Sequence, residues 1–194
     1  NRKGGYLAAR YLINLGRRRI AFMAGFWDPP CGEHELHKAV NLPRAGSYST
    51  LDRFHGYLRA LDEAGIAYDP ELAVISGYDN QSGYVAAQTL LARKTGMDAL
   101  LVPNSYTAEG AMRYFRERTV RVPSEISVFS FDDGGLASIL ATPVTALQHD
   151  MRRMGRCAIE SLHALLSGNP APDTVIDVNF IIRESTSVKT SAAF

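Results

Sequence analysis

The sequence has few of the features that mark disulfide-rich, membrane-spanning or strongly nucleic-acid-binding proteins. Cys31 and Cys157 are the only cysteines among 194 residues, too few and too far apart for a disulfide framework or a zinc site. No apolar run approaches the roughly 20 residues that a membrane-spanning helix needs. The formal net charge of +1 excludes a strong electrostatic attraction to nucleic acid over the whole chain. With 46% hydrophobic and 21% charged residues, the composition is that of an ordinary globular domain.

Motifs of several enzyme classes are absent as well. Neither the dinucleotide-binding pattern G-x-G-x-x-G nor the phosphate-binding loop G-x-x-x-x-G-K occurs, and a G-x-S-x-G nucleophile elbow is missing. His34, Glu35 and His37 lie close together, but their spacing fits no standard zinc pattern, and a solvated loop is the better interpretation. We therefore expect no enzyme activity, no cofactor and no metal. A Rossmann-like enzyme is the weakest of the functions considered.

The sequence begins at Asn1, without a methionine and directly in a helical pattern, so we expect a fragment of a longer protein. The lack of a secretory signal carries little weight for that reason. A short basic cluster, Arg17-Arg18-Arg19, follows the first helical pattern. Because a DNA-binding patch needs more charge, we interpret this cluster as a solvated turn.

Helical and extended patterns alternate along the chain. Apolar residues at helical spacing occupy residues 7–15, 54–61, 82–92, 107–116 and 150–167. Short apolar runs typical of buried strands occupy residues 19–24, 72–76, 99–102 and 126–131, and a further strand is expected at 174–182. Because the helical segments are long enough to connect parallel strands, the alternation predicts an α/β fold with a doubly wound parallel sheet.

Residues 26–49 interrupt this alternation. The segment has no clear period and contains Pro29, Pro30, Gly32 and Gly46. Irregular loops of this length are uncommon in compact domains and are often functional or mobile. We expect a lid or mobile flap near a ligand-binding cleft.

The most informative segment is residues 122–133, Val-Pro-Ser-Glu-Ile-Ser-Val-Phe-Ser-Phe-Asp-Asp. A proline-containing turn leads into an alternating apolar run that ends on Asp132 and Asp133. In open α/β sheets, ligands bind in the crevice beyond the carboxyl ends of the strands. The pattern therefore predicts that carboxylate oxygens lie at such a crevice.

Several motifs, in a consistent order, resemble the effector-binding domain of the LacI/GalR family of transcriptional regulators. Residues 122–133 are similar to the family's P-x-D-I-S-V-x-G-F-D-D, and Pro143-Val-Thr145 follows. Further similar motifs are Gly4-Gly-Tyr6, Arg53-Phe-His-Gly-Tyr57, Asn104 with Ala108-Glu-Gly-Ala111, Met154-Gly155 and Arg183-Glu-Ser-Thr186. The likeness covers nearly the whole chain. It departs from the family at Arg17, Ser105 and Ser130, where histidine, aspartate and glycine are usual.

The resemblance implies a periplasmic-binding-protein-like (type I) fold, in which two similar α/β subdomains joined by three crossovers hold the effector between them. On this template, residues 1–25 end the first part of the N-terminal subdomain, and residues 26–147 form the C-terminal subdomain. Residues 148–179 return to the N-terminal subdomain, and residues 180–194 form the last crossover strand and a tail. The strand at 19–24 and the helix at 150–167 then belong to a partial second subdomain with one open apolar flank.

Asp132 and Arg53 are the strongest candidates for ligand binding. A carboxylate at a strand end can accept charge-assisted hydrogen bonds from two hydroxyl groups of a sugar-like ligand. The alternative for Asp132 is a helix N-cap, although Asp133 is the more natural cap. Arg53 is similar to a family arginine that enters the cleft, and its planar fork suits vicinal hydroxyls or a carboxylate. The alternative for Arg53 is a surface salt bridge with Asp52 or Glu63.

Four further residues are weaker candidates. Tyr78 occupies a position where the family often presents an aromatic ring, which would stack on a sugar; a packed loop tyrosine is nearly as plausible. Asn104 ends a strand and offers both a donor and an acceptor, or else forms a turn. His149 lies on a crossover, where it contacts either the ligand or the hinge backbone. Trp27, the only tryptophan, either stacks on a ligand or packs in its loop.

The leading interpretation is the effector-binding domain of a cytoplasmic transcriptional regulator, which binds a small, sugar-like metabolite and has no membrane partner. The resemblance implies that ligand binding closes the cleft and changes operator affinity. It also implies a homodimer that binds DNA through a headpiece absent from this sequence. The alternative is a periplasmic sugar-binding protein of the same fold, although the sequences of residues 143–145 and 183–186 resemble those of the regulators more closely.

Overall fold

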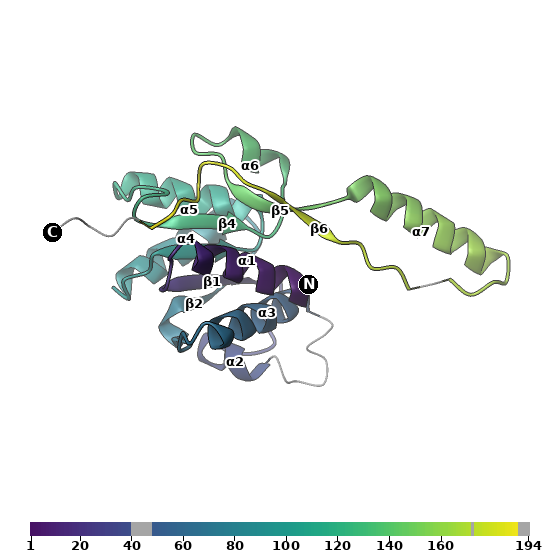
Figure 1. The fold of residues 1–194 in the computed structure, drawn as a ribbon, viewed down its shortest axis with the longest axis horizontal. Helices are drawn as coiled ribbons and strands as arrows, with labels where there is room; N and C mark the ends of the chain where they lie inside the picture. Colours follow the sequence, from purple (N-terminus) through teal and green to yellow (C-terminus); the bar gives the residue numbers. More distant parts are fainter. Residues whose placement is uncertain (40–47, 172, 190–194) are drawn as a thin grey trace.

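The computed structural model of the chain describes residues 1–39, 48–171 and 173–189. These residues form a six-stranded sheet with the order β2-β1-β3-β4-β5-β6 (Figure 1). Neighbouring strands run parallel except β5 and β6, which are antiparallel. The predicted α/β fold is confirmed, although β5 was not among the predicted strands. The strands are β1 (Ile20–Gly25), β2 (Ala73–Ser76), β3 (Ala99–Val102), β4 (Ser127–Ser130), β5 (Thr145–His149) and β6 (Val178–Ile181).

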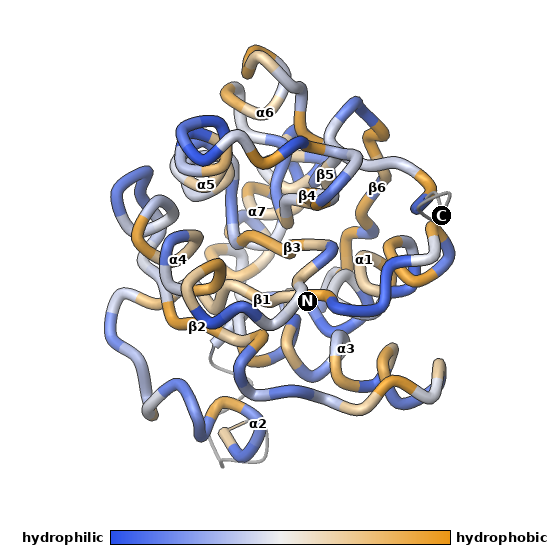
Figure 2. Tube along the Cα trace, turned by 90° about the vertical axis from the view of Figure 1, so that its left-hand side faces the viewer, coloured by the Kyte–Doolittle hydropathy of each residue, from blue (hydrophilic) through white to orange (hydrophobic). Residues whose placement is uncertain are grey.

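Helices cover both faces of the sheet, as a doubly wound fold requires. α1 (Arg2–Asn14) and α3 (Ser49–Glu63) pack together on one face, and α4 (Asn80–Ala92) and α5 (Ser105–Glu117) on the other (Figure 2). In β1, Phe22 and Ala24 join the core under α1 and α3, while Ala21 and Met23 join the core under α4 and α5. Because successive strand residues face opposite sides, a strand between two helical layers must be apolar throughout. The shorter helical elements are η1 (Glu33–Glu35), α2 (Leu36–Ala39), η3 (Pro70–Leu72) and α6 (Gly135–Ile139).

Two glycines let α1 and α3 approach closely. A side chain at Gly5 would collide with the backbone of Arg53, and a side chain at Gly56 would collide with the backbone of Arg2. The absence of a β-carbon at these two positions is therefore what permits the contact. The packing fixes the first turns of α3, which carry Arg53, against α1.

The expected assignment of residues 1–25 to a separate subdomain is wrong. β1 lies inside the main sheet, where Phe22 pairs with Ala73 of β2 and Ile20 pairs with Ala99 of β3. All six residues of β1 are buried. Because β1 is paired along both edges and covered on both faces, the first helix and strand belong to the same body as α3, α4 and α5. The chain does not cross to another subdomain after residue 25.

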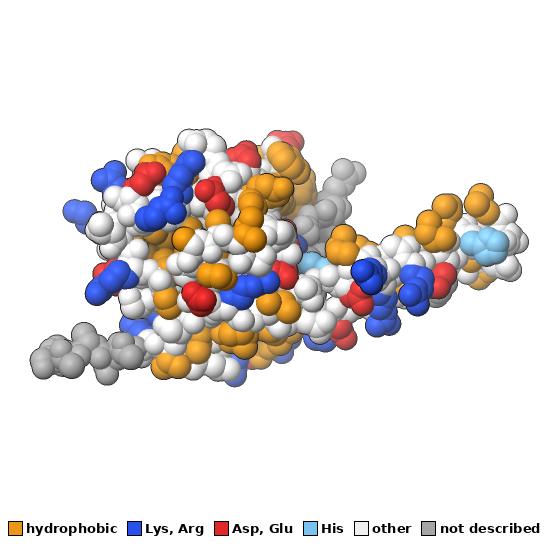
Figure 3. All heavy atoms as spheres, turned by 90° about the horizontal axis from the view of Figure 1, so that it is seen from above, with side chains coloured by type: hydrophobic (Ala, Val, Ile, Leu, Met, Phe, Trp, Pro, Cys, Tyr) orange, Lys and Arg blue, Asp and Glu red, His pale blue; other side chains and the backbone are white. Residues whose placement is uncertain are grey.

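α7 (Met151–Leu166) stands apart from this body, and β5 and β6 connect it to the sheet (Figure 1). We call residues 150–177 the α7 arm. None of the 16 residues of α7 is buried, and hydrophobic side chains lie open along it (Figure 3). The open apolar flank predicted for this helix is confirmed, but the strand expected beside it is β1 of the main sheet. The return of residues 148–179 to a second subdomain stays a prediction. The large apolar side chains exposed on α7 are Met151, Met154, Ile159, Leu162, Leu165 and Leu166.

Arg17 is buried, contrary to the solvated turn predicted for residues 17–19. The residue is 0% exposed, and its guanidinium donates hydrogen bonds to the carbonyl oxygens of Pro123 (2.7 Å), Glu125 (3.0 Å) and Asp98 (3.1 Å). Burial lowers the pKa of Arg17, while the Asp98 carboxylate raises it. Arg17 therefore ties the turn after α1 to the loop before β4 and to the start of β3.

The described part of the loop at residues 26–49 is anchored to the edge of the sheet. Leu36 is buried in the core beneath α3. Glu33 accepts a hydrogen bond from the backbone amide of Ile75 (3.0 Å) and forms an ion pair with Arg93 (2.7 Å). Glu33 thus occupies a donor of edge strand β2 that would otherwise be open to another strand. These contacts fix residues 33–39 to the sheet edge, the lid or mobile flap expected of residues 26–49 stays a prediction, and residues 40–47 lie outside the described residues.

Candidate ligand-binding site

The six residues predicted to bind ligand lie along one edge of the sheet, at the carboxyl ends of its parallel strands. The N-terminus of α3 reaches the same edge, because Thr50 donates a hydrogen bond to the carbonyl oxygen of Gly25 at the end of β1 (2.6 Å). In open α/β sheets this edge is where ligands bind. The six are Trp27 after β1, Tyr78 after β2, Asn104 after β3, Asp132 after β4, His149 at the end of β5, and Arg53 in α3.

Arg53 is held in the body rather than paired on the surface. Its guanidinium carbon lies 5.1 Å from the centroid of the Phe131 ring, and Nη1 donates a hydrogen bond to the carbonyl oxygen of Pro103 (3.3 Å). Burial lowers the pKa of Arg53, whereas Tyr78 and Asp132 raise it. An arginine nevertheless stays protonated near neutral pH. The surface salt bridge considered as an alternative does not form among the described residues. The charged guanidinium of Arg53 can therefore donate hydrogen bonds to a ligand at the edge of the sheet.

Asp132 joins two turns at this edge. Its Oδ1 accepts hydrogen bonds from the backbone amides of Ser105 (2.9 Å) and Gly134 (3.3 Å). Within residues 1–39, 48–171 and 173–189, Oδ2 has no hydrogen-bond partner. The carboxylate is therefore oriented by the protein through one oxygen, and the other oxygen can accept from a ligand.

Asp133 has a different role from the helix cap that its position suggested. Its carboxylate lies 2.7 Å from Nη2 of Arg183 and accepts a hydrogen bond from Nε2 of Gln148 (3.1 Å). The N-cap of α6 is Gly134, and no side chain caps that helix. The cap assignment was wrong because the turn after β4 directs Asp133 toward β5 and the segment after β6.

Tyr78 and Trp27 form an aromatic pair at the other end of the edge. Their ring centroids lie 5.2 Å apart with the planes tilted by 47°, and Trp27 is 83% exposed. The Tyr78 hydroxyl lies 3.3 Å from Oγ1 of Thr50. Both rings border a hollow of about 260 Å³ that also includes Phe26 and Tyr48. Packing within the loop therefore leaves most of the indole open.

Asn104 uses its side chain to shape the edge. Its Oδ1 accepts a hydrogen bond from the Thr107 amide (2.8 Å), which caps α5, and its Nδ2 donates to the carbonyl oxygen of Tyr78 (2.8 Å). The turn-forming alternative thus describes what this side chain does. It also connects the α5 cap to the loop that carries Tyr78.

His149 lies between two further hollows. One, of about 340 Å³, is bordered by Arg53, Phe131 and His149. The other, of about 650 Å³, is bordered by Asp132, His149 and Asn179. Because His149 borders both, the imidazole and the two strongest polar candidates, Arg53 and Asp132, surround one stretch of the edge.

Sequence reasoning missed three contributors to this edge. Phe131 lies under the Arg53 guanidinium, Thr50 bonds to the end of β1, and Ser105 supplies a backbone donor to Asp132. Phe131 had a signal, since it ends the apolar run just before the two aspartates. Thr50 precedes a helical apolar pattern and so suggests a helix cap, but Tyr48 holds that position. Nothing in the sequence pointed to the Ser105 amide.

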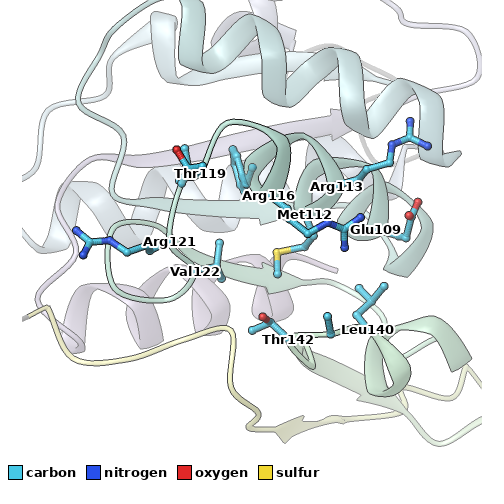
Figure 4. Close-up of a pocket in the computed structure, with 12 residues that line it drawn as sticks. Glu109, Met112, Arg113, Arg116, Thr119, Arg121, Val122, Leu140 and Thr142 are labelled. Atoms are coloured by element: carbon cyan, nitrogen blue, oxygen red, sulfur yellow. The ribbon is translucent and has the colours of Figure 1, made fainter.

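Another hollow, of about 350 Å³, lies away from this edge, between α5 and the segments that precede β4 and β5 (Figure 4). Figure 4 shows Met112 directed toward its centre, near Val122 and Leu140, while Arg121 extends away from it. None of the six predicted residues borders it. It therefore has no part in the candidate site.

The described residues offer neither a metal site nor a membrane-spanning helix. No group of three histidine, cysteine, aspartate or glutamate residues in this part of the chain could hold a metal ion. His34, one of the residues weighed for zinc, instead lies 4.0 Å from Glu71. Over the same residues, no helix has the length and hydropathy to span a membrane.

Residues 9–186 match the family of periplasmic binding protein-like domains. The HTH-type transcriptional repressor PurR of Vibrio atlanticus (strain LGP32) is 29% identical over 188 residues, which covers 97% of this chain and 51% of the relative. The ribose operon repressor of Haemophilus influenzae is 29% identical over 185 residues, covering 94% of this chain and 50% of the relative. The chain thus spans about half the length of the curated relatives that it matches.

A solved structure gives a comparable likeness. A sugar-binding transcriptional regulator of the LacI family from Escherichia coli, solved in complex with phosphate, superposes with a TM-score of 0.80 at 28% identity. The superposition covers 96% of this chain and 61% of that chain. The fold and the order of elements are therefore shared over nearly all of the 194 residues.

Proposed function

Because the chain belongs to the family of periplasmic binding protein-like domains, we propose that it is the effector-binding domain of a DNA-binding transcriptional regulator. Its ligand is a small, sugar-like metabolite bound at the carboxyl edge of the sheet. The observation that carries the proposal is the position of His149, which borders both the hollow of Arg53 and the hollow of Asp132. Charged donors and acceptors therefore border two neighbouring hollows, one on each side of His149, at the carboxyl edge of the sheet.

The polar groups at the edge suit a polyhydroxylated ligand. Oδ2 of Asp132 accepts from a ligand hydroxyl, and Oδ1 stays bonded to two backbone amides that hold the carboxylate in place. Hydrogen bonds to a charged group are shorter and stronger than neutral ones. Arg53 offers a planar set of donors, which Phe131 and Pro103 hold in position. Tyr78 adds an aromatic surface for the apolar face of a sugar ring.

The relatives support this class of ligand and this kind of protein. One is named for the ribose operon, and a superposed structure is described as a sugar-binding regulator. They are transcriptional repressors or regulators, which favours a regulator over the periplasmic sugar-binding protein considered as the alternative. In such a regulator the chain would act within a homodimer, in the cytoplasm, with DNA bound through a headpiece outside these 194 residues.

Coupling to DNA requires two arrangements of the protein that bind the ligand with different affinity, since equal affinity shifts nothing. The α7 arm supports such a coupling, because β5 and β6 join it to the body beside Asp132 and His149. A ligand in the hollow between Asp132 and Asn179 would touch the body and the base of the arm together. Closure of the cleft around the ligand would then reorient whatever the arm contacts.

Calorimetry on the complete gene product, with a panel of pentoses, hexoses and their methyl glycosides, tests the proposal. We expect at least one of these compounds to bind saturably and to change the affinity for a DNA sequence that the protein selects from a random library. Saturable sugar binding without DNA selection would favour the periplasmic alternative. The absence of any sugar binding would contradict the ligand class.

A further inference from the structure

Trp27 is the only tryptophan of the chain, and it lies 83% exposed at the ligand-binding edge. Its ring touches Tyr78, but this contact covers little of the indole. Tryptophan side chains are on average highly buried, and they are enriched where an apolar surface meets a partner. The exposed indole is therefore an apolar surface that is open to a binding partner.

The hollow beside Trp27 differs in chemistry from the hollows beside Arg53 and Asp132. Aromatic side chains make up most of its wall: Phe26, Trp27, Tyr48 and Tyr78. The one charged residue that borders it is Asp28. The hydroxyl groups of Thr50 and Tyr78 lie 3.3 Å apart and supply a polar end. This environment suits a ring with an apolar face and a hydroxyl or ether oxygen, and it does not suit a free anion.

The aromatic and polar hollows adjoin through the first turns of α3. Thr50 borders the aromatic hollow, and Arg53, three residues later, borders a polar one. Residues three apart on a helix are neighbours on its surface. One helical turn rises about 5.4 Å, which is of the order of the length of one pyranose ring. A ligand with two linked rings could therefore place one ring in each hollow.

We propose, on the basis of the proposed function, that the effector is a two-ring glycoside rather than a simple monosaccharide. The sugar ring lies at Arg53 and Asp132, and its substituent, an aryl or a second glycosyl ring, lies against Trp27 and Tyr78. Trp27 then determines the specificity for the substituent, while the polar residues bind the sugar.

Matched ligands test this inference in the complete gene product. Calorimetry is carried out with methyl glycosides of common pentoses and hexoses, with the phenyl glycosides of the same sugars, and with disaccharides that carry the same sugar at the non-reducing end. We expect a phenyl glycoside or a disaccharide to bind about tenfold or more tightly than the matched methyl glycoside. The tighter ligand should also shift the emission of Trp27, the only tryptophan of these 194 residues, measured as the difference between the wild type and Trp27→Phe, whereas the methyl glycoside should leave this emission nearly unchanged.

Substitutions then assign the difference to Trp27. Trp27→Ala should remove the preference for the second ring without weakening the methyl glycoside, and Trp27→Phe should keep most of it. Tyr106→Ala is the matched control, because Tyr106 is exposed and follows β3 but borders none of these hollows. Equal affinity for the methyl and two-ring compounds, or a preference that survives Trp27→Ala, overturns this inference and leaves the proposed function intact. Binding of neither compound contradicts the sugar ligand itself.

Discussion

The carboxylate of Asp133 lies 2.7 Å from the guanidinium of Arg183, beside the antiparallel pair of strands β5 and β6 that carries the α7 arm. Asp133 also accepts a hydrogen bond from Gln148 on β5, the strand that leads to the arm, and Arg183 follows β6, the strand that returns from it. Asp133 thus contacts β5 and the segment that follows β6. Asp132, its neighbour in sequence, has an oxygen available for a ligand. Two consecutive aspartates therefore join the candidate site to the base of the arm.

The Asp133–Arg183 pair should contribute measurably to stability. Both side chains are mostly buried, and removing one partner of a buried pair leaves an uncompensated charge. We expect Asp133→Ala to lower the free energy of unfolding by about 2 kcal/mol, below the roughly 3–5 kcal/mol of a fully buried pair. Urea denaturation of Asp133→Ala, Arg183→Met and the double variant measures the coupling, expected at about 0.5–3 kcal/mol.

The exposed pair of Arg121 and Glu125 is a suitable control, and Arg121→Ala should leave the unfolding midpoint almost unchanged. Additive effects of Asp133→Ala and Arg183→Met would show that the two side chains do not act together. The tie between the two strands would then have to come from backbone pairing alone.

Asp132→Asn should weaken effector binding while preserving the local fold. The amide oxygen can replace Oδ1 as acceptor for the Ser105 and Gly134 amides, but the negative charge is lost. We expect a cost of about 1.5–3 kcal/mol in binding free energy, the range for a hydrogen bond to a charged group. Calorimetry with whichever glycoside binds the wild type measures it. Asp62→Ala, an exposed acid on α3, is the control. Unchanged affinity in Asp132→Asn, with an unchanged circular dichroism spectrum, would remove Asp132 from the site.

The sequence predicted most of the elements, because their apolar periods are clear. The strand predicted at residues 99–102 is β3 itself, and the run at 126–131 contains β4 (Ser127–Ser130) and places Asp132 at the sheet edge. β5 was missed because Pro143 precedes it and its last two residues are polar. Such local patterns reflect which face of a helix or strand is buried, so they predict the element even when the tertiary fold is unknown.

Tertiary relationships were harder to predict. The pattern of residues 20–25 shows that β1 is buried on both faces, but it cannot show which sheet the strand joins, and so the subdomain assignment failed. Arg17 was misread because a cluster of arginines normally lies in water, whereas this side chain is surrounded by backbone carbonyls from three distant segments, at residues 98, 123–125 and 187. The different roles of Asp132 and Asp133 depend on the conformation of the turn after β4. A turn has no hydrophobic periodicity from which that conformation could be predicted.

Arg17 should matter far more for stability than its neighbour in sequence. Arg17→Met keeps much of the side-chain volume but leaves the carbonyl oxygens of Pro123 and Glu125 without this donor, while the carbonyl oxygen of Asp98 keeps the Ser127 amide. Each unsatisfied buried acceptor costs about 1–3 kcal/mol, so we expect a loss of several kcal/mol in the free energy of unfolding. Urea denaturation followed by circular dichroism measures it. Arg18→Met, at an exposed position, should stay within about 0.5 kcal/mol of the wild type. Similar losses in the two variants would contradict the buried role of Arg17.

The apolar face of α7 should contribute little to the stability of the 194-residue chain. Leu162 and Leu165 are 52% and 60% exposed, so charged replacements there remove little buried surface. We expect Leu162→Glu and Leu165→Glu to change the free energy of unfolding of the body by less than about 0.5 kcal/mol. Leu12→Ala, at a fully buried position of α1, should cost about 2–5 kcal/mol in the same urea denaturation. If the arm packs on a second subdomain in the complete gene product, as the family resemblance implies, the α7 replacements should become costly there. Because an amphipathic helix draws most of its stability from packing, a small effect in both proteins would show that its face stays open in each.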